Sequence, residues 1–197
     1  MYTFELQDPI FLPHTACEVR LSLNDRQAMV LFGENGIGKS TLLQRLASQM
    51  KSTEYVIVEQ RTSDYFYDRK LGVLKNIFLE LKLPEFNSST FLLLWKVFGL
   101  EEKEERLLSH LSGGESQALK LVLGLCKDAA VYFLDEPSQF LDPVKKKILY
   151  GQLELFRSQG KKLLVVEHQK DHLPKGWKAQ ELVMIDGILK SGSEWTI

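Results

Sequence analysis

A glycine-rich segment near the amino terminus has the residues and the spacing to hold a chain of phosphates. Residues 33–40 read GENGIGKS, which fits the pattern G-x-x-x-x-G-K-[ST]. The glycines of such a loop let backbone N–H groups turn inward around phosphate oxygens. The ammonium of Lys39 can reach the β- and γ-phosphates, and the hydroxyl of Ser40 can ligate Mg²⁺. The predicted phosphate-binding residues are Gly33, Glu34, Asn35, Gly36, Ile37, Gly38, Lys39, Ser40 and Thr41.

Two consecutive carboxylates follow a short apolar run in the second half of the chain. Asp135 and Glu136 come directly after VYFL at residues 131–134. Ligands of parallel sheets bind at the carboxyl ends of the strands. Asp135 is suited to hold the shell of a Mg²⁺ ion, and Glu136 is suited to polarise a water that attacks the γ-phosphate. A single acid here would read as an ordinary helix cap, but two acids beside a phosphate loop favour hydrolysis of a nucleotide.

A serine and two glycines precede a helical pattern over residues 116–126. Residues 111–115 read LSGGE, and Ser112 with Glu115 forms a capping box, which starts many ordinary helices. A capping box does not need two glycines, which cost stability near a helix. Glycines at this place let another molecule approach the backbone closely, and the start of a helix attracts anions. The segment therefore predicts a second anion site.

The elements that must position these residues alternate between strands and helices. Continuous apolar runs predict strands that are buried on both faces, as in a parallel sheet covered by helices. These runs occupy residues 28–32, 55–58, 131–134 and 163–166. A further run at 182–185 leads through the turn dipeptide Asp186-Gly187 into a short hairpin, and a helix is expected over 41–50. The alternation indicates an α/β fold with a mostly parallel sheet flanked by helices.

Residues 68–110 have a different character, because their apolar residues recur at helical spacing and no strand pattern appears. Two helices are expected, over 71–81 and 91–100, followed by a charged run at 101–106 that we interpret as a solvated helix face. We predict one domain over residues 1–197, with a core formed by 1–67 and 111–197 and a small helical lobe at about 68–110.

The composition of the 197 residues argues against several classes of protein. Lys and Arg number 25 and Asp and Glu 26, which argues against binding of nucleic acid over a broad basic face. No run of 18 apolar residues and no secretory signal pattern is present, which predicts a cytoplasmic protein. Cys17 and Cys126 lie in apolar surroundings and are expected to be buried thiols.

The order of these motifs resembles the ATPase domain of the ABC (ATP-binding cassette) family over nearly the whole chain. The resemblance implies a P-loop NTPase fold, with ATP and Mg²⁺ as cofactors. It also implies that two cassettes close head to tail, so that Leu111, Ser112, Gly113, Gly114 and Glu115 of one subunit cover the γ-phosphate held by the other. The second cassette would be a further copy of this chain or a paralogue.

The same resemblance assigns roles to residues that would carry little weight alone. Gln60, at the end of a strand, would sense Mg²⁺ and the attacking water, so that Ser40, Gln60 and Asp135 surround the metal. His168 would contact the γ-phosphate and orient the water or Glu136, and Lys39, Gln60, Glu136 and His168 would form the catalytic set. Asp142 would be the acid of a loop that contacts the other cassette. Phe11 is the expected adenine-stacking residue, with Phe4 or Tyr2 as alternatives.

Three features depart from the family pattern. The segment between Lys39 and Gln60 has room for only one helix and one strand, which predicts a trimmed antiparallel β-subdomain. Glu115 stands where the family usually has Gln, and we expect it to cap the helix. Residues 116–119 stand where an Arg-rich stretch is common. The sequences LSGGE and Val-Glu-His at 166–168 are shared with soluble members of the family.

Three functions are consistent with these residues. We favour an ATP-binding subunit that drives a membrane transporter through a separate transmembrane permease, and that is cytoplasmic or held on the cytoplasmic face of a membrane by this partner. Three aromatic residues within 62–68 would then either face the permease or pack on the helical lobe. The alternatives are a soluble ABC ATPase without a transport role and a nucleotide-gated module with little hydrolysis.

Overall fold

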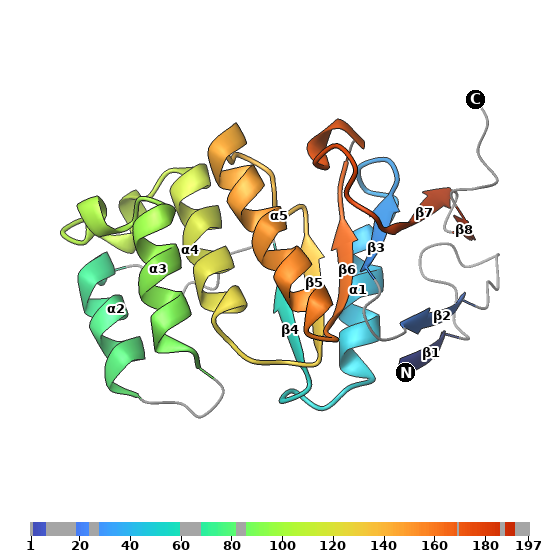
Figure 1. Ribbon diagram of the computed structural model, residues 1–197, viewed down its shortest axis with the longest axis horizontal. Helices are drawn as coiled ribbons and strands as arrows, with labels where there is room; N and C mark the ends of the chain where they lie inside the picture. The colour runs from blue at the N-terminus through green and yellow to red at the C-terminus, as the bar shows by residue number, and fades with distance from the viewer. Residues whose placement is uncertain are drawn as a thin grey trace.

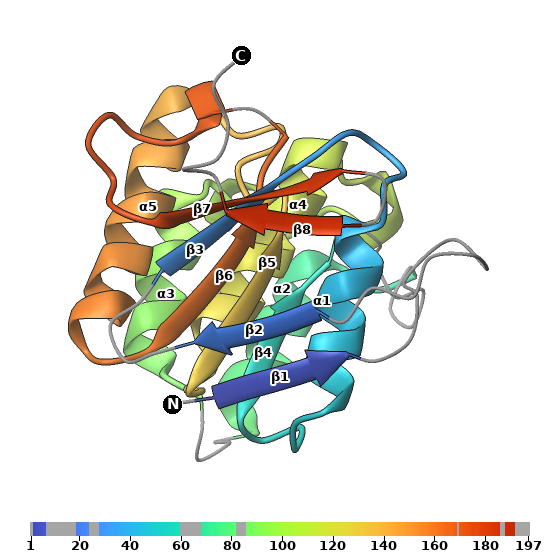
Figure 2. The same cartoon turned by 90° about the vertical axis from the view of Figure 1, so that its right-hand side faces the viewer.

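The computed structural model describes residues 2–6, 19–23, 28–59, 68–81, 86–168, 170–185 and 188–191. Its centre is a six-stranded sheet in the order β4-β5-β6-β3-β7-β8 (Figure 2). The strands are β4 (Tyr55–Val58), β5 (Val131–Asp135), β6 (Lys162–Val166), β3 (Ala28–Phe32), β7 (Gln180–Ile185) and β8 (Ile188–Ser191). The first five are parallel and β8 pairs with β7 in the antiparallel sense. The expected α/β fold with a mostly parallel sheet is therefore confirmed.

A separate two-stranded antiparallel sheet, β1 (Tyr2–Leu6) and β2 (Val19–Leu23), packs beside the main sheet (Figure 2). It is the small antiparallel part that the sequence predicted in trimmed form. The side chains of Leu21 and Leu23 are buried in the same apolar cluster as Leu31 of β3. These two strands therefore close one side of the core.

Helices cover both faces of the main sheet (Figure 1). α1 (Lys39–Ser48) packs on the face that carries Met29 and Phe133, while α4 (Gly113–Leu125) and α5 (Pro143–Ser158) pack on the face that carries Val30 and Tyr132. Strands β3, β5 and β6 are buried throughout, as their continuous apolar sequences predict.

Strand β4 departs from the expected burial on both faces. It lies at the edge of the sheet, so Val56 and Val58 are buried while Tyr55 and Ile57 are half-buried. A uniform apolar run does not reveal whether a strand has one neighbour or two, because position in the sheet is a tertiary property.

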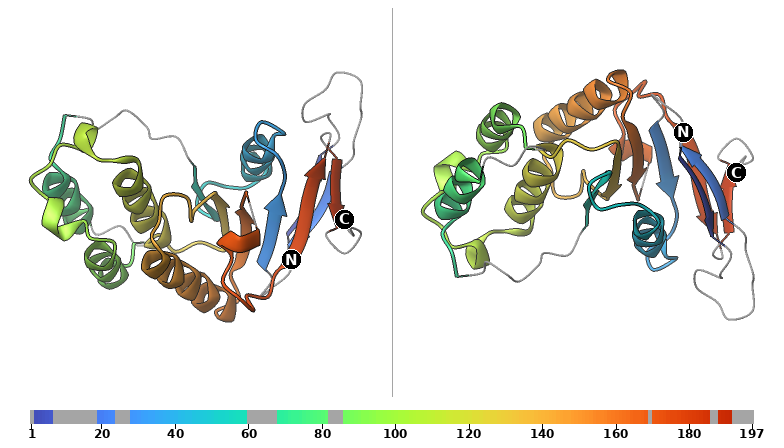
Figure 3. Two further views of the ribbon diagram at one scale, coloured as in Figure 1. Left: turned by 90° about the horizontal axis from the view of Figure 1, so that it is seen from above. Right: turned by 90° about the horizontal axis from the view of Figure 1, so that it is seen from below.

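The helical lobe lies at the end of the molecule away from β1 and β2 (Figures 1 and 3). It contains α2 (Leu71–Glu80), α3 (Ser88–Val97) and two short 3₁₀ turns, η2 (Glu101–Lys103) and η3 (Leu108–His110), and a third such turn, η4 (Lys170–His172), follows β6. Aromatic rings from α2, from α3 and from the bridge residue Phe86 form its centre, where Phe91 lies 5.1 Å from both Phe86 and Trp95.

The charged run at residues 101–106 is only partly the solvated helix face that its composition suggested. It forms the 3₁₀ turn η2 followed by a bend. Glu101 and Glu102 are exposed, whereas the four residues at 103–106 each form an ion pair. Glu104 accepts hydrogen bonds from the ammonium of Lys75 at 2.6 Å and from the indole of Trp95 at 3.0 Å. The run therefore ties the lobe together instead of facing only solvent.

The cysteines and the helix lengths bear on two further expectations from the sequence. Cys126 is a free, buried thiol whose pKa burial raises to about 12, whereas Cys17 lies outside the described residues. Within the described ranges, each helix is too short or too polar to cross a bilayer.

Candidate functional site

The phosphate loop connects the end of β3 to the start of α1. Gly36 and Gly38 adopt φ values of 78° and 104°, which favour glycine. A Cβ atom at Gly33 would lie 2.9 Å from the carbonyl oxygen of Met184, so only glycine fits this close approach to β7. Among the described residues, no side chain caps the first turn of α1. The N–H groups there can therefore donate to phosphate oxygens, as the sequence predicts.

Lys39 turns back into this loop. Its side chain is buried, and its ammonium donates hydrogen bonds of 2.8 Å to the carbonyl oxygens of both Gly33 and Glu34. Burial lowers the pKa of Lys39, while the charges of Glu136 and Asp135 raise it. The cation thus stands between the loop and the two carboxylates.

The register of the sheet brings Asp135 and Glu136 to the edge that carries the phosphate loop. Val166 of β6 is the partner of Leu31 on one side and of Asp135 on the other, so β3, β5 and β6 end together. Asp135 therefore lies level with the end of β3, which leads into the phosphate loop, with β6 between the two strands. This is the edge at which ligands of parallel sheets bind.

Asp135 is buried, and its Oδ1 atom has no hydrogen-bond partner among the described residues. Burial raises the pKa of Asp135, whereas a hydrogen bond from Ser40 and the charge of Lys39 lower it. An unpartnered carboxylate oxygen next to a serine hydroxyl fits the oxygen ligands that Mg²⁺ prefers. No cluster of three or more His, Cys, Asp or Glu side chains that could hold a metal exists in the described part of the chain. Ser40 and Asp135 are therefore the described residues that would hold a Mg²⁺ ion.

Glu136 begins the loop that follows β5. Its φ of 46° is unusual for a residue other than glycine, and its N–H donates to the carbonyl oxygen of Val166 at 3.0 Å. Burial and the charge of Asp135 raise the pKa of Glu136, while Lys39 and His168 lower it. The amide of Gln117, buried in α4, lies 3.5 Å from the carbonyl oxygen of Glu136. A carboxylate with a raised pKa at this position is suited to act as a general base.

His168 lies two residues after the end of β6 and is exposed. Its charge lowers the pKa of Glu136, so the two side chains lie near each other. Gln60 and Phe11, which the resemblance placed near the metal and the adenine, lie outside the described residues, and the side chain of Phe4 does as well. The ammonium of Lys162 lies over the ring of the alternative residue Tyr2, 5.2 Å from the ring centre. Lys162 begins β6, so Tyr2 lies at the opposite end of the sheet from the phosphate loop.

The segment 111–115 begins α4 with a complete capping box. The N–H of Glu115 donates to the Ser112 hydroxyl at 3.3 Å, and the carboxylate of Glu115 accepts from the Ser112 N–H at 2.8 Å. The expectation that Glu115 caps the helix therefore agrees with the geometry. Leu111 ends the preceding turn, and Gly113 is exposed.

Two cations of the helical lobe also hold Glu115, which the sequence did not reveal. Lys103 lies 2.7 Å and Arg106 lies 3.3 Å from its Oε1 atom. The hydrogen bonds from Lys103 and Ser112 lower the pKa of Glu115 to about 2. Glu115 is therefore an ionised residue turned into its own helix and toward the lobe.

The loop between Glu136 and α5 passes close to the start of α4. A Cβ atom at Gly114 would lie 3.1 Å from the carbonyl oxygen of Phe140, so glycine permits this approach. Phe140 is 70% exposed with a φ of 61°. Asp142 caps α5 by accepting from the N–H of Lys145 at 2.9 Å.

The start of α4 and the phosphate loop face the same edge of the molecule, but α4 and α1 lie apart (Figures 1 and 3). In one chain, therefore, the two predicted anion sites do not meet.

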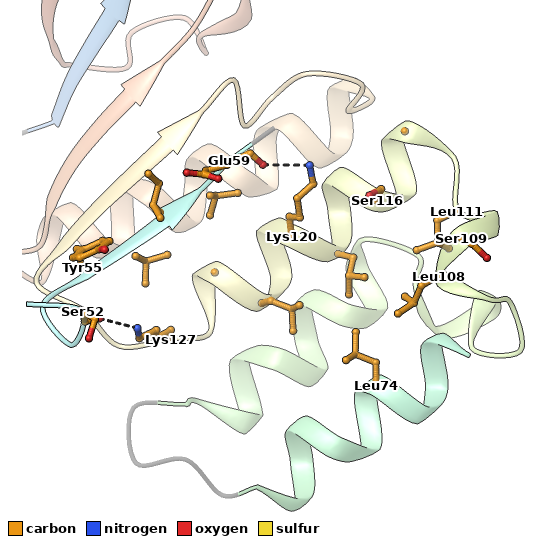
Figure 4. A pocket seen from close by; sticks show the side chains of 17 residues that line it. Ser52, Tyr55, Glu59, Leu74, Leu108, Ser109, Leu111, Ser116, Lys120 and Lys127 are labelled. Atoms are coloured by element: carbon orange, nitrogen blue, oxygen red, sulfur yellow. Dashed lines mark hydrogen bonds between the residues drawn. The ribbon is translucent and has the colours of Figure 1, made fainter. Parts of the chain in front are cut away.

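A cavity of about 930 Å³ lies between the edge strand β4, helix α4 and the lobe, away from the phosphate loop (Figure 4). Its walls include Tyr55, Leu74 and Leu108, and Lys120 and Lys127 stand along it. The ammonium of Lys120 donates to the carbonyl oxygen of Glu59 at 3.2 Å. The cavity between the core and the lobe is thus mainly apolar, with two lysine side chains along its wall.

Glu167 is a buried acid beside the site, and the sequence analysis assigned it no role. It is 0% exposed and follows β6 in the same way that Glu136 follows β5. An acid directly after a continuous apolar strand was the signal that could have identified it.

Comparison with known proteins supports these assignments at the level of the fold and the family. The model of the family described as "ABC transporter" matches residues 17–139. The chain is 29% identical to translation initiation factor RLI1 of Saccharomyces cerevisiae, over 84% of this chain and 28% of the yeast protein. It therefore spans only about a quarter of the length of that relative.

The chain is similar to a transporter subunit to a comparable degree. The chain is 28% identical to the energy-coupling factor transporter ATP-binding protein EcfA1 of Thermotoga maritima, over 79% of this chain and 68% of that protein. A solved structure described as the ATP-binding subunit of an ABC transporter superimposes with a TM-score of 0.75, covering 96% of this chain and 90% of the other at 17% identity. That likeness establishes the P-loop NTPase fold.

Proposed function

The chain belongs to the ABC transporter family, and from this premise we propose that it is a cytoplasmic ATP-binding subunit that hydrolyses ATP to drive a membrane transporter through a separate transmembrane partner. The observation that carries the ATPase part is the meeting of Lys39, Asp135 and Glu136 at one edge of the sheet. A cation in a phosphate loop, a metal-binding acid and a base with a raised pKa are the groups that hydrolysis of a γ-phosphate needs.

Each residue has a distinct task in this reaction. The loop N–H groups and Lys39 hold the phosphates in line for attack, and Glu136 accepts the proton of the attacking water. His168 orients that water or Glu136, and Gln60 senses Mg²⁺ and the same water. When bound, Mg²⁺ supplies positive charge to the phosphate oxygens, and Ser40 and Asp135 are the described residues that would hold it.

The site needs a second cassette. The start of α4 faces the same edge as the phosphate loop but lies apart from it, so the Ser112 to Glu115 segment serves an ATP held by another subunit. Phe11 is retained as the adenine-stacking residue of this proposal, and Asp142 as the acid of the loop between the subunits.

Two observations support the transport part of the proposal. The cavity between β4, α4 and the lobe offers a partner an apolar recess with cations beside it. The similarity to EcfA1, an ATP-binding protein of a transporter, extends over 79% of this chain. A permease that contacts this recess would sense movement of the lobe relative to the core.

The hydrolysis part is tested with Glu136→Gln. This variant should bind ATP with unchanged affinity and hydrolyse it roughly 10²- to 10⁴-fold more slowly, because it lacks the base. Glu101→Gln, on the exposed turn η2, is the matched control and should hydrolyse ATP like the wild type. Equal turnover by Glu136→Gln and the wild type would refute the assignment of the base.

The transport part is tested by purification from native membranes. A multi-span protein should copurify with the wild type and be lost with Ser109→Trp, which fills the mouth of the cavity from an exposed position. Ser89→Trp replaces another exposed serine, on α3 and outside the cavity lining, and should retain the partner. Equal recovery with both variants would refute the cavity as the docking site.

A second candidate is a soluble ABC ATPase without a transport role. It is favoured by the 29% identity to translation initiation factor RLI1, which extends over 84% of this chain. Cofractionation of the chain with a large soluble particle, and absence of a multi-span protein from the membrane purification, would favour this candidate over the first.

A further inference from the structure

The carboxylate of Glu167 is withdrawn from solvent at the end of β6. The residue is 0% exposed and directly precedes His168. Removing a carboxylate from water is unfavourable unless hydrogen bonds replace its hydration. The residues that supply those hydrogen bonds therefore indicate what the carboxylate holds in place.

One oxygen of this carboxylate joins two other parts of the chain. Its Oε1 atom accepts a hydrogen bond of 2.8 Å from the hydroxyl of Tyr150 and one of 3.4 Å from the N–H of Ser138. Tyr150 is buried in α5, with its ring edge-on to Trp177 at 5.0 Å. The backbone N–H of Glu167 also donates to the carbonyl oxygen of Leu31 at 3.1 Å. Three segments thus meet at Glu167: β3 before the phosphate loop, helix α5, and the loop after β5.

Ser138 is well placed to control that loop. It lies between Glu136 and Asp142 and is 0% exposed. The N–H of Gln139 donates to the carbonyl oxygen of Glu136 at 3.0 Å, and the N–H of Leu141 donates to that of Ser138 at 3.2 Å. Because these hydrogen bonds fold the loop on itself, holding Ser138 in place restricts the backbone from Glu136 to Leu141, which directly precedes Asp142.

We propose that Glu167 is a positioning residue for ATP hydrolysis, whose carboxylate holds the loop 136–142 in register with the segment that carries His168. Glu167 is withdrawn from solvent and acts through Ser138 and Tyr150. The inference rests on the proposed ATPase function, because it concerns the relative placement of Glu136 and His168. A shift of about 1 Å between such groups is enough to slow a reaction by roughly 100-fold.

Two substitutions of Glu167 separate hydrogen bonding from bulk. Glu167→Gln keeps an oxygen that can accept from Ser138 and Tyr150, whereas Glu167→Leu has a similar volume and no acceptor. We expect Glu167→Leu to lower kcat at least about tenfold with KM for ATP changed less than about twofold, and Glu167→Gln to retain kcat within about threefold. A Gln variant as slow as the Leu variant would overturn positioning through these hydrogen bonds.

A pair of tyrosine variants keeps the test valid if Glu167→Leu does not fold. Tyr150→Phe removes the 2.8 Å hydrogen bond to Glu167. Tyr132→Phe removes another buried hydroxyl, which donates to the carbonyl oxygen of Lys127 at 2.7 Å and accepts from the N–H of Ala129 at 3.3 Å, before the start of β5. Both variants should lose thermal stability, and only Tyr150→Phe should lower kcat, by about threefold or more. Equal kcat for the two variants would show that Glu167 only stabilises the fold.

Hydrogen exchange gives a readout that does not depend on catalysis. The peptide that covers 136–142 should exchange at least about tenfold faster in Tyr150→Phe than in the wild type and in Tyr132→Phe. Unchanged exchange in this peptide would overturn the inference even if the wild type hydrolyses ATP. A wild type without hydrolysis would refute the proposed function, while the exchange experiment would still decide the role of Glu167.

Discussion

At the scale of single residues, the ammonium of Lys39 occupies the centre of the phosphate loop. It already donates to two carbonyl oxygens of the loop, so its direction is set before a nucleotide binds. Lys39→Ala should weaken ATP binding roughly 10- to 100-fold, which corresponds to one hydrogen bond to a charged group. Lys51→Ala, an exposed lysine after α1, is the matched control. Titration with a fluorescent ATP analogue measures both affinities, and equal values would contradict the assignment.

The ionisation of Glu136 predicts how hydrolysis depends on pH. Burial and the charge of Asp135 raise the pKa of Glu136 above its usual value of 4.5. A base works only when it is deprotonated, so the rate must fall as the pH falls through this raised value. The acid limb of kcat/KM should therefore lie above pH 4.5, with an apparent pKa that belongs to the Asp135–Glu136 pair. A limb at or below pH 4.5 would contradict the raised pKa.

At the scale of elements, Gly124 shows how closely α4 packs on β4. A Cβ atom at this position would lie 2.5 Å from Cγ2 of Val58 and 3.4 Å from Cγ1 of Val56. Alanine normally stabilises a helix by about 1 kcal/mol relative to glycine. Gly124→Ala should nevertheless lower the free energy of unfolding, by about 1–3 kcal/mol, because the helix must move off the sheet.

Gly151 is the matched control for that substitution. It lies in the exposed part of α5, and among the described residues nothing lies within 4 Å of a Cβ atom built there. Gly151→Ala should raise the free energy of unfolding by roughly 0.5–1 kcal/mol. Urea denaturation of both variants measures the effects, and destabilisation of equal size would contradict the packing argument.

The start of α4 predicts a pH-dependent contribution to stability. The folded-state pKa of Glu115 is lowered from 4.5 to about 2, so its stabilising effect is present above pH 4.5 and is lost as the pH falls toward 2. Glu115→Gln keeps a capping group but loses the ion pairs to Lys103 and Arg106, which should cost roughly 0.5–1 kcal/mol at pH 7. The difference from the wild type should shrink between pH 4.5 and pH 2. Glu102→Gln, exposed on η2, should show no such pH dependence.

Elements with a strong local signal were predictable, and their tertiary partners were not. The apolar runs of β3, β5 and β6 identify strands because burial on both faces selects branched and aromatic residues. The motif residues Lys39 and Asp135 meet because parallel strands end at one edge, which the sequence order implies. The pairing of Glu115 with Lys103 and the hydrogen bonds of Glu167 depend on how the lobe and α5 pack, and neither leaves a local pattern.

At the scale of the whole molecule, the phosphate loop and the start of α4 lie at the same edge (Figure 1). The phosphate loop and the start of α4 lie apart along this edge, and Phe140, beside Gly114, is 70% exposed. Val144, at the start of α5, is 68% exposed. Together, Phe140 and Val144 leave apolar surface at this edge that a second subunit would bury. This arrangement predicts closure of two chains around ATP.

Light scattering of Glu136→Gln tests that closure directly. With Mg²⁺ and ATP, the mass should rise from 22.6 kDa to twice that value, because ATP is bound but not hydrolysed. Ser112→Arg should abolish the rise by placing a bulky side chain where the other subunit's phosphate must enter. Phe140→Asp should also abolish it, and Asp tolerates the backbone conformation at this position.

Leu93→Asp is the control for this experiment, since Leu93 is 61% exposed on α3, away from that edge. It should dimerise with ATP like its parent. A mass that stays at the monomer value in Glu136→Gln, with ATP binding confirmed separately, would contradict a homodimer and leave a paralogous cassette as the partner. Dimerisation that survives both Ser112→Arg and Phe140→Asp would show that the chains meet through another face, because both residues stand where a head-to-tail pair must touch.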